Sequence, residues 1–124
     1  MIFFRQKQEG LSAHWHILNE TTQVQEVLDA SQDRPQLVFK HSTRCSISSM
    51  AWHRILAQEE ALANTYDLHY LDLIAYRPVT DAITQASGIP HASPQVLVFH
   101  KGKLVFDASH HLIEPEVLMA LQVA

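Results

Sequence analysis

The 124-residue sequence predicts an α/β fold with a mixed central sheet flanked by helices. One observation is that short β-rich runs alternate with segments of helical periodicity, a pattern typical of parallel strands joined by crossover helices. A second is a pair of apolar runs on either side of the tight turn Lys101-Gly102-Lys103, which predicts a hairpin of antiparallel strands. The expected order of elements is β-α-β-α-β-α-β-β-α.

The composition supports a folded domain and excludes several classes of protein. Hydrophobic residues make up 47% of the chain and charged residues 18%, so a core can form. The net charge of −4 argues against a nucleic-acid-binding protein, which usually carries a basic face. No apolar run approaches the roughly 20 residues of a membrane span, and the apolar N-terminus is too short for a signal peptide. We therefore expect a cytoplasmic protein without a nucleic-acid or membrane partner.

The beginning of the chain predicts an arm, a strand and a helix. Residues 1–14 are polar and poorly periodic, which indicates a loose N-terminal arm, while residues 15–124 are expected to form a single domain. Residues 15–19 predict a short strand. A helix should follow, with a Thr-Thr pair as its N-cap and its end near Ser31.

The next strand leads into a longer helix. Residues 36–40 form a short apolar run bounded by turn signals, which predicts a buried strand. From residue 45 to about residue 64 the pattern is helical. The buried face of this helix is expected to carry Ile47, Met50, Ala51 and Ile55.

The second half of the chain supplies the remaining elements. Residues 68–73 alternate with a period of two, which predicts a strand. A helix should begin near Pro78 and end at Gly88, because proline suits a first turn and glycine a C-terminal cap. The two hairpin strands are expected at 95–100 and 104–107, and a last helix closes the chain.

Cys45 is the single cysteine of the chain, and it follows a buried strand and opens a helix. One cysteine excludes an internal disulfide and a cysteine-rich zinc site. The first turn of a helix presents free N–H groups and the positive end of the dipole, which favour a thiolate, and Arg44 adds a positive charge. Because the thiolate is the nucleophile in disulfide exchange, this position predicts a reactive thiol. The alternative is a small buried side chain without chemistry.

Ser48 completes a Cys-x-x-Ser pattern with Cys45. A second cysteine at this position would resolve a mixed disulfide internally, whereas serine cannot. The pattern therefore predicts a monothiol mechanism that needs an external thiol for release. The Ser48 hydroxyl is expected to donate a hydrogen bond to the Cys45 thiolate from one helical turn away.

Three other polar features are candidates for the site. Ser93-Pro94 stands just before a strand, where an X-Pro bond is either a functional cis peptide or simply the start of the strand. Arg77 suits the carboxylate of a small thiol, although a surface role is the simpler interpretation. Lys40 and His41 precede the cysteine loop and either tune the thiolate or belong to a solvated loop.

Four segments together are similar to a known family. The segment 40–48 resembles the active-site segment of the YtxJ-like bacillithiol-system redox proteins, also called monothiol bacilliredoxins. The segments 70–73, 91–97 and 108–110 agree, and the resemblance covers roughly residues 15–122. His91-Ala92 departs from the expected pattern, which has a larger polar residue after the histidine, but this leaves the catalytic assignment intact.

The resemblance implies a thioredoxin-like fold in which Cys45 is the nucleophile and Pro94 a cis-proline facing it. It further implies that bacillithiol, a small thiol bearing glucosamine and malate, is the co-substrate and that S-bacillithiolated client proteins are the partners. No tightly bound cofactor and no metal are expected. The expected catalytic residues are Cys45 and Ser48, and the expected substrate-binding residues are Thr43, Arg44, Ser93, Pro94 and Arg77.

Three alternatives remain open from the sequence. The protein is a glutathione-using monothiol glutaredoxin-like enzyme, a carrier of an iron–sulfur cluster held by Cys45 and an external thiol, or a thioredoxin-like interaction domain with an inert cysteine. Brown colour in the isolated protein favours the cluster carrier. Failure of Cys45 to form an adduct with any small disulfide favours the inert domain.

Overall fold

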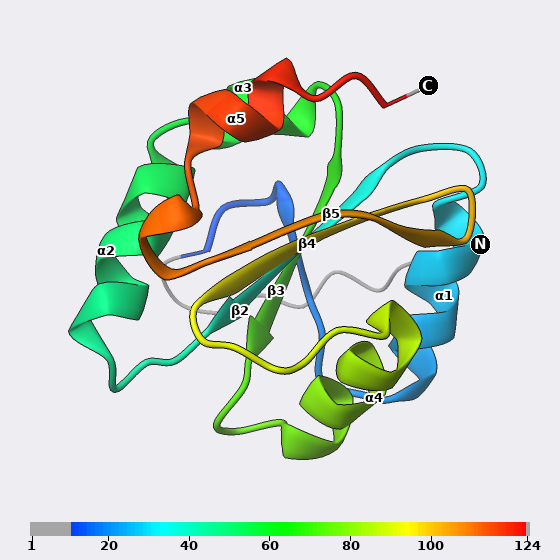
Figure 1. Cartoon of the computed structure of the whole chain (residues 1–124), viewed down its shortest axis with the longest axis horizontal. Coiled ribbons are helices and arrows are strands. Elements are labelled where there is room, and N and C mark those ends of the chain that lie inside the picture. The colour runs from blue at the N-terminus through cyan, green and yellow to red at the C-terminus, as the bar shows by residue number, and fades with distance from the viewer. Residues whose placement is uncertain (1–10, 124) are drawn as a thin grey trace.

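The computed structural model describes residues 11–123, and Figure 1 shows a central sheet with helices on both sides. The predicted order of strands and helices is confirmed, with one additional helix and a short 3₁₀ turn. The elements are β1 (Trp15–Ile17), α1 (Thr22–Ala30), β2 (Gln36–His41), α2 (Ser46–Leu56), α3 (Glu59–Ala63), β3 (Asp67–Asp72), α4 (Arg77–Ser87), β4 (Gln95–His100), β5 (Lys103–Ser109), η1 (His110–Leu112) and α5 (Pro115–Ala120).

The sheet is mixed, as the sequence predicts, and its strand order is β1-β3-β2-β4-β5. The strands β1 and β2 both run parallel to β3, and helical crossovers make these parallel connections possible. The strand β4 is antiparallel to both β2 and β5. The hairpin turn between β4 and β5 places Lys101 and Gly102 at positive φ, 55° and 80°, where glycine is favoured.

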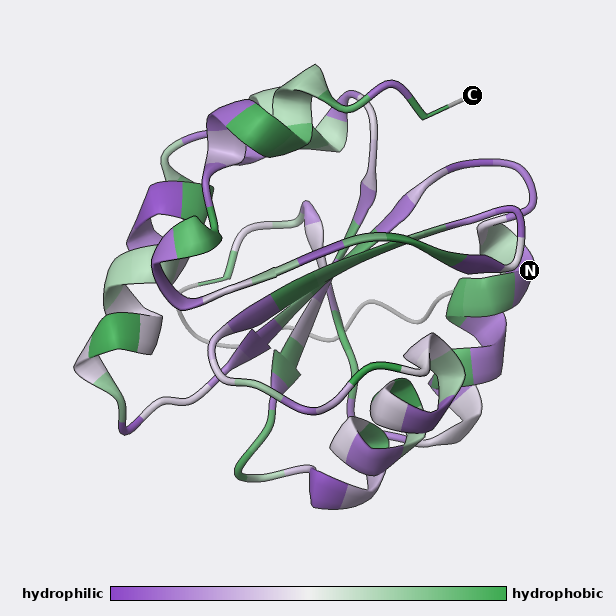
Figure 2. Cartoon of the chain, in the orientation of Figure 1, coloured by the Kyte–Doolittle hydropathy of each residue, from purple (hydrophilic) through white to green (hydrophobic). Residues whose placement is uncertain are grey.

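Two apolar clusters fill the space between the sheet and its helices. One lies under α2, α3 and α5 and includes Leu37 and Phe39 of β2. The other lies under α1 and α4 and includes Val38 of the same strand. Because successive side chains point to opposite faces, a strand covered on both faces is apolar along its middle, as residues 37–39 of β2 are. Figure 2 shows this as hydrophobic colour along the middle of β4.

The C-terminal end of β2 lies inside the sheet, between β3 and the start of β4. Lys40 is paired with Leu71 of β3 and with Gln95 of β4. From here the chain leaves β2 through residues 42–45 and enters α2, and the segment that precedes β4 arrives at the same end of the sheet. Two segments that carry predicted site residues therefore flank one strand end.

The single helix predicted from residue 45 to about residue 64 is wrong, because the chain breaks into α2 and α3. The break falls at Gln58, whose φ of −122° and ψ of 20° are not helical. The change of direction leaves Leu62 fully buried in the same cluster as Ile55. It also brings Glu59 to the indole of Trp15, whose Nε1 donates a hydrogen bond of 2.8 Å to the carboxylate.

The predicted buried face of α2 is also partly wrong. Ala51 and Ile55 are fully buried as expected, but Ile47 is 54% exposed and Met50 62% exposed. Ser48 is buried in their place. Residues 48, 51 and 55 follow helical spacing, and the polar member of this face is tolerated because its hydroxyl is hydrogen-bonded.

The predicted N-terminal arm falls largely on residues 1–10, which lie outside the described residues. Leu11 packs against the cluster under α2, and the Ser12 hydroxyl donates a hydrogen bond of 2.9 Å to Glu59. The end of the predicted arm is therefore attached to the domain. Among residues 11–123, no helix has the length and apolar character needed to cross a bilayer.

Candidate active site

Cys45 is the N-cap residue of α2, as its position in the sequence predicts. Its backbone is extended, with φ −114° and ψ 122°, and its side chain is half-buried. The Cys45 N–H donates to the Ser42 carbonyl over 3.2 Å, and the Cys45 carbonyl accepts from the Ser49 N–H over 3.0 Å. These two bonds fix the residue between loop and helix. Cys45 is thus placed at the N-terminal end of α2, where the first N–H groups have no partner within the helix.

The Ser48 hydroxyl is buried and is held by two partners from the end of β2. The Ser42 N–H donates to Ser48 Oγ over 2.9 Å, and Oγ lies 2.7 Å from Nδ1 of His41. A hydroxyl has one proton, so a bond donated to His41 and a bond donated to Cys45 exclude each other. The expected bond from Ser48 to the thiolate stays a prediction.

His41 is buried among aromatic rings on the α2 side of the sheet. Its ring stacks on Trp52 with centroids 5.9 Å apart and lies at similar distances from Phe39 and Tyr70. This burial lowers the pKa of His41, while the carboxylate of Asp72 acts in the opposite direction. The ring is therefore neutral, and its tautomer decides whether Nδ1 accepts a hydrogen bond from the Ser48 hydroxyl or donates one to it.

Lys40 occupies the opposite face of the same strand end and is fully buried. Its Nζ lies 2.7 Å from Nδ1 of His91 and donates a bond of 2.8 Å to Oε1 of Gln95. Burial lowers the pKa of Lys40 from 10.5 to about 8, partly opposed by the charge of Asp81. The sequence leaves open whether Lys40 and His41 belong to a solvated loop, and the structure excludes this by burying both.

The segment before β4 contains a cis peptide bond between Ser93 and Pro94, as expected for a cis-proline at this position. Pro94 is buried, and its carbonyl accepts a hydrogen bond of 3.1 Å from the His110 N–H. The Ser93 hydroxyl is buried without a hydrogen-bond partner among the described residues. Pro94 directly precedes β4, and the pairing of Lys40 with Gln95 therefore places it beside the end of β2, from which the chain continues to Cys45.

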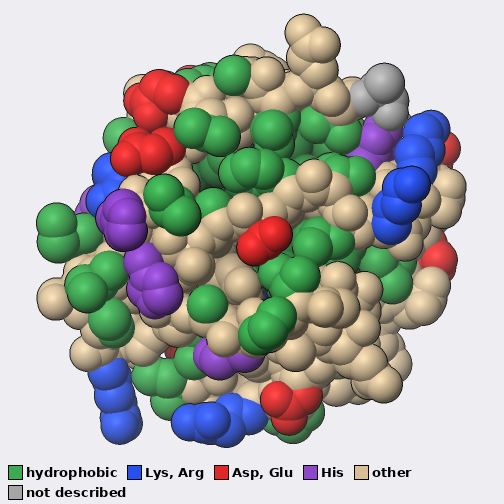
Figure 3. Space-filling model, viewed as in Figure 1, with side chains coloured by type: hydrophobic (Ala, Val, Ile, Leu, Met, Phe, Trp, Pro, Cys, Tyr) green, Lys and Arg blue, Asp and Glu red, His purple; other side chains and the backbone are tan. Residues whose placement is uncertain are grey.

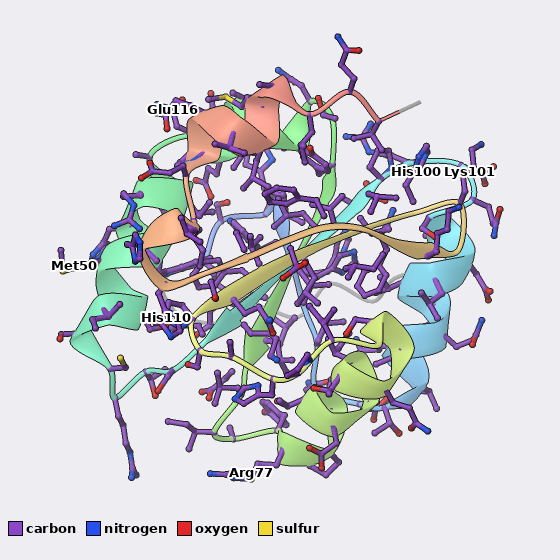
Figure 4. All side chains as sticks on the ribbon, in the orientation of Figure 1. Met50, Arg77, His100, Lys101, His110 and Glu116 are labelled. Carbon is purple, nitrogen blue, oxygen red and sulfur yellow. The ribbon has the colours of Figure 1, made fainter. Side chains whose placement is uncertain are left out.

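Three other predicted substrate contacts lie at the surface. Thr43 and Arg44 are exposed in the loop that precedes Cys45. Arg77 is exposed at the start of α4, and Figure 4 shows its side chain pointing outward from that helix. The pKa of His91 is lowered first by burial, then by the charge of Lys40 and then by the charge of Arg77. Arg77 therefore lies on the Lys40 side of the sheet.

Exposed apolar side chains lie close to the start of α2. Ile47 and Met50 project from this helix, and Leu112 of the adjoining turn η1 is 61% exposed. Figure 3 shows hydrophobic side chains and histidines side by side over α2 and η1. Within residues 11–123, no group of three or more metal-ligating side chains is arranged to hold a metal ion.

The sheet order and the placement of a single cysteine at a strand-to-helix junction, with a cis-proline beside that strand end, define a thioredoxin-fold thiol–disulfide oxidoreductase. The solved structures support this class. A structure assigned as an oxidoreductase with a thioredoxin fold shares 27% identity, covers 84% of this chain and 89% of its own, and superposes with a TM-score of 0.72. The thioredoxin of Malassezia sympodialis shares 17% identity and the fold, with 84% coverage of both chains and a TM-score of 0.64.

The family is given by residues 16–118, which match the model of the monothiol bacilliredoxin BrxC. The chain belongs to this family of thiol–disulfide oxidoreductases, which confirms the resemblance carried by residues 40–48. A second thioredoxin, mitochondrial thioredoxin 3 of Saccharomyces cerevisiae, has 13% identity, covers 82% of this chain and 87% of its own, and has a TM-score of 0.63.

Proposed function

We propose that this protein removes bacillithiol from S-bacillithiolated client proteins through a mixed disulfide on Cys45. The observation that carries the proposal is the single cysteine at the N-cap of α2 in a chain of the monothiol bacilliredoxin family. The thiolate of a cysteine is the attacking form in disulfide exchange, and the half-buried Cys45 sulfur is the candidate for this role.

In the first step the Cys45 thiolate attacks the bacillithiol sulfur of the client mixed disulfide. A new S–S bond forms between Cys45 and bacillithiol while the old one breaks. The electron pair leaves with the client sulfur, which takes a proton and becomes a thiol. In the second step the thiolate of another bacillithiol attacks the bacillithiol sulfur on Cys45. This releases the Cys45 thiolate and yields bacillithiol disulfide, so the client is reduced and one free bacillithiol is oxidised, while the other half of the disulfide comes from the client.

Dependence on an external thiol follows from the residue at position 48. Ser48 cannot form a disulfide, and its hydroxyl is held by His41 and Ser42. Its proposed contribution is to hold the loop that carries Cys45. The adduct on Cys45 then persists until a second thiol arrives, which makes bacillithiol a co-substrate rather than a bound cofactor.

The remaining site residues are proposed to contact the bacillithiol moiety or the client. Bacillithiol carries the carboxylates of malate, and guanidinium groups bind carboxylates with paired hydrogen bonds. Arg44 is exposed next to Cys45, and Arg77 is exposed on α4. The buried Ser93 hydroxyl has a free donor beside Pro94, and Thr43 offers a second hydroxyl in the cysteine loop.

The proposed location is the cytoplasm, because regeneration consumes reduced bacillithiol and therefore needs a reducing compartment. The proposed partners are the S-bacillithiolated client proteins, which Cys45 must reach directly. The half-buried sulfur at a helix end is compatible with attack on a disulfide at the surface of another protein.

Intact-mass measurement tests the proposal. The protein is exposed in parallel to bacillithiol disulfide and glutathione disulfide, and a single bacillithiol adduct is expected to form faster and to disappear when a thiol is added. Cys45→Ser should abolish the adduct completely, and Ser46→Ala should leave it unchanged. Equal or faster labelling by glutathione contradicts bacillithiol specificity, and no adduct from either disulfide contradicts thiol exchange altogether.

A further inference from the structure

We propose that Lys40 is a positioning residue that holds the 90–95 segment, and with it the Ser93–Pro94 peptide, in place beside Cys45. The inference rests on the proposed thiol exchange at Cys45 and names a residue on which its geometry depends. Lys40 itself does not touch the reacting sulfur atoms, because it lies on the opposite face of β2 from Ser48 and α2.

The buried ammonium group of Lys40 contacts the 90–95 segment near both of its ends, at His91 and at Gln95. Lys40 is 0% exposed, and its Nζ contacts His91 at 2.7 Å and Gln95 at 2.8 Å. The Gln95 side chain continues the contacts inward, since its Oε1 also accepts from the Ala92 N–H at 3.4 Å. Its Nε2 donates to the Pro90 carbonyl at 3.4 Å. The Lys40 side chain, directly and through Gln95, thus holds by hydrogen bonds the segment that contains Ser93 and Pro94.

An ammonium group suits this position because it brings three donors to neutral acceptors. One donor is used on Gln95 Oε1, and the bond to His91 Nδ1 makes that nitrogen the acceptor of the imidazole. The His91 proton then resides on Nε2. Methionine has a similar length but no donor, so it fills the space without making either bond.

The end of β2 connects the hydrogen bonds of Lys40 to the segment that carries Cys45. Lys40 and His41 are consecutive, and the sheet alternation sends one to the 90–95 segment and the other to Ser48. Both segments of the proposed site are therefore hydrogen-bonded to neighbouring residues of one strand. Loss of the Lys40 bonds is therefore expected to displace Pro94 relative to Cys45 while the bonds of Ser48 at the start of α2 remain.

The charge of Lys40 does not by itself stabilise the fold. Its charged form is less favourable in the fold than in water, because burial lowers the pKa to about 8. Asp81 on α4 raises this pKa, and Arg77 at the start of α4 acts electrostatically on His91, the neutral partner of Lys40. A buried charge that makes hydrogen bonds only to neutral partners is costly to keep, and a geometric role accounts for its presence.

The test compares two reactions of the same sulfur in Lys40→Met and in the matched control Lys103→Met, an exposed lysine of β5. The first reaction is transfer of bacillithiol from a bacillithiolated protein to Cys45. The second is alkylation of Cys45 by iodoacetamide, which needs no contact with the 90–95 segment. Lys40→Met is expected to slow transfer by roughly tenfold or more and to change alkylation less than twofold, since small misplacements at a reacting centre have effects of this size. Lys103→Met should change neither.

The pH dependence gives a readout that a loss of folding does not reproduce. The ratio of wild-type to Lys40→Met transfer rates should be largest below about pH 8 and shrink above it, as Lys40 loses its charge in the wild type. His91→Ala removes one of the two acceptors at an exposed position and should give a smaller slowing. It also serves as the test variant if Lys40→Met does not fold, and its slowing of transfer without slowing of alkylation then carries the proposal.

An equal slowing of transfer and alkylation overturns the positioning role, as does a transfer rate that neither variant changes. Failure of the proposed function looks different. In that case wild-type Cys45 takes no bacillithiol, and the ratio of the two rates is measured with glutathione disulfide instead. The positioning role of Lys40 is thus judged separately from the identity of the thiol.

Discussion

Lys40 and His41 are consecutive residues at the end of β2, yet they serve two different regions of the molecule. His41 lies among aromatic rings under α2 and binds the hydroxyl of Ser48. Lys40 lies on the α4 side and binds the segment that carries Pro94. The alternation of a strand thus lets two neighbouring residues anchor the two halves of one site.

Burial lowers the pKa of both His41 and Lys40, but it leaves the two side chains in different charge states. The pKa of His41 starts at 6.5 and is lowered, so the ring is neutral at physiological pH. The pKa of Lys40 is lowered only to about 8, so the ammonium stays charged. The cysteine side of the site is therefore built with neutral hydrogen bonds, and the proline side is built around a cation.

The largest expected effect of pH on stability distinguishes the Lys40 region from the His41 region. In the fold Lys40 releases its proton at about pH 8, whereas in the unfolded chain it does so at 10.5. The unfolded state binds more protons between these values, so the free energy of unfolding should rise with pH across this window. Lys40→Met should remove up to about 3 kcal/mol of this rise. Urea unfolding at several pH values measures it, and identical profiles for variant and wild type contradict the buried charge.

Removal of the Ser48 hydroxyl tests the His41 region. Ser48→Ala leaves His41 Nδ1 and the Ser42 N–H buried without their partner, and should lower the free energy of unfolding by about 1–3 kcal/mol. Ser46→Ala, exposed two residues earlier, should change it by less than about 0.5 kcal/mol. Cys45 of Ser48→Ala should still take the thiol adduct. Complete loss of the adduct in this variant means that Ser48 acts on the sulfur directly.

The free energy of unfolding should also depend on pH on the acid side, where the expected effect of His41 is smaller than that of Lys40 at alkaline pH. Because the pKa of His41 is below 6.5 in the fold, the unfolded chain takes up a proton first as pH falls below that value. Stability should therefore fall with decreasing pH, and His41→Gln should make the decline shallower. Part of the decline must remain, since the pKa of His69 is lowered to about 3 and that of His91 is also lowered. A profile unchanged by His41→Gln contradicts a neutral buried ring.

The smallest expected effect concerns the surface of α2. Met50 is 62% exposed, so Met50→Ser should change the free energy of unfolding by less than about 0.5 kcal/mol. Ile55→Ala on the buried face of the same helix should lower it by about 2–5 kcal/mol. Denaturant unfolding of the two variants checks which face of α2 packs on the sheet, and similar losses would support the face predicted from hydrophobicity.

Much of the fold follows from local patterns. The apolar runs of β2 and β4 predict strands covered on both faces, and Gly88 predicts the end of α4 because it adopts a φ of 74° there. The face of α2 is not predictable in this way. Ile47 and Met50 satisfy the apolar spacing equally well, and only the partners of Ser48 decide which stripe faces inward.

The sequence by itself predicts the part of the site that contains Cys45, Ser48 and the Ser93-Pro94 pair. A lone cysteine after a strand and a serine three residues later predict a monothiol at a helix start, because the strand-to-helix junction is a local pattern. The X-Pro pair leaves open whether its bond is cis or simply begins the strand, and the family resemblance predicts the cis form. The second half is decided by the tertiary structure. Lys40 and His41 look like the edge of a polar loop until β3 and β4 enclose them. Their partners His91, Gln95 and Ser48 come from distant or separate segments, and burial becomes a property of a residue only when those segments pack together.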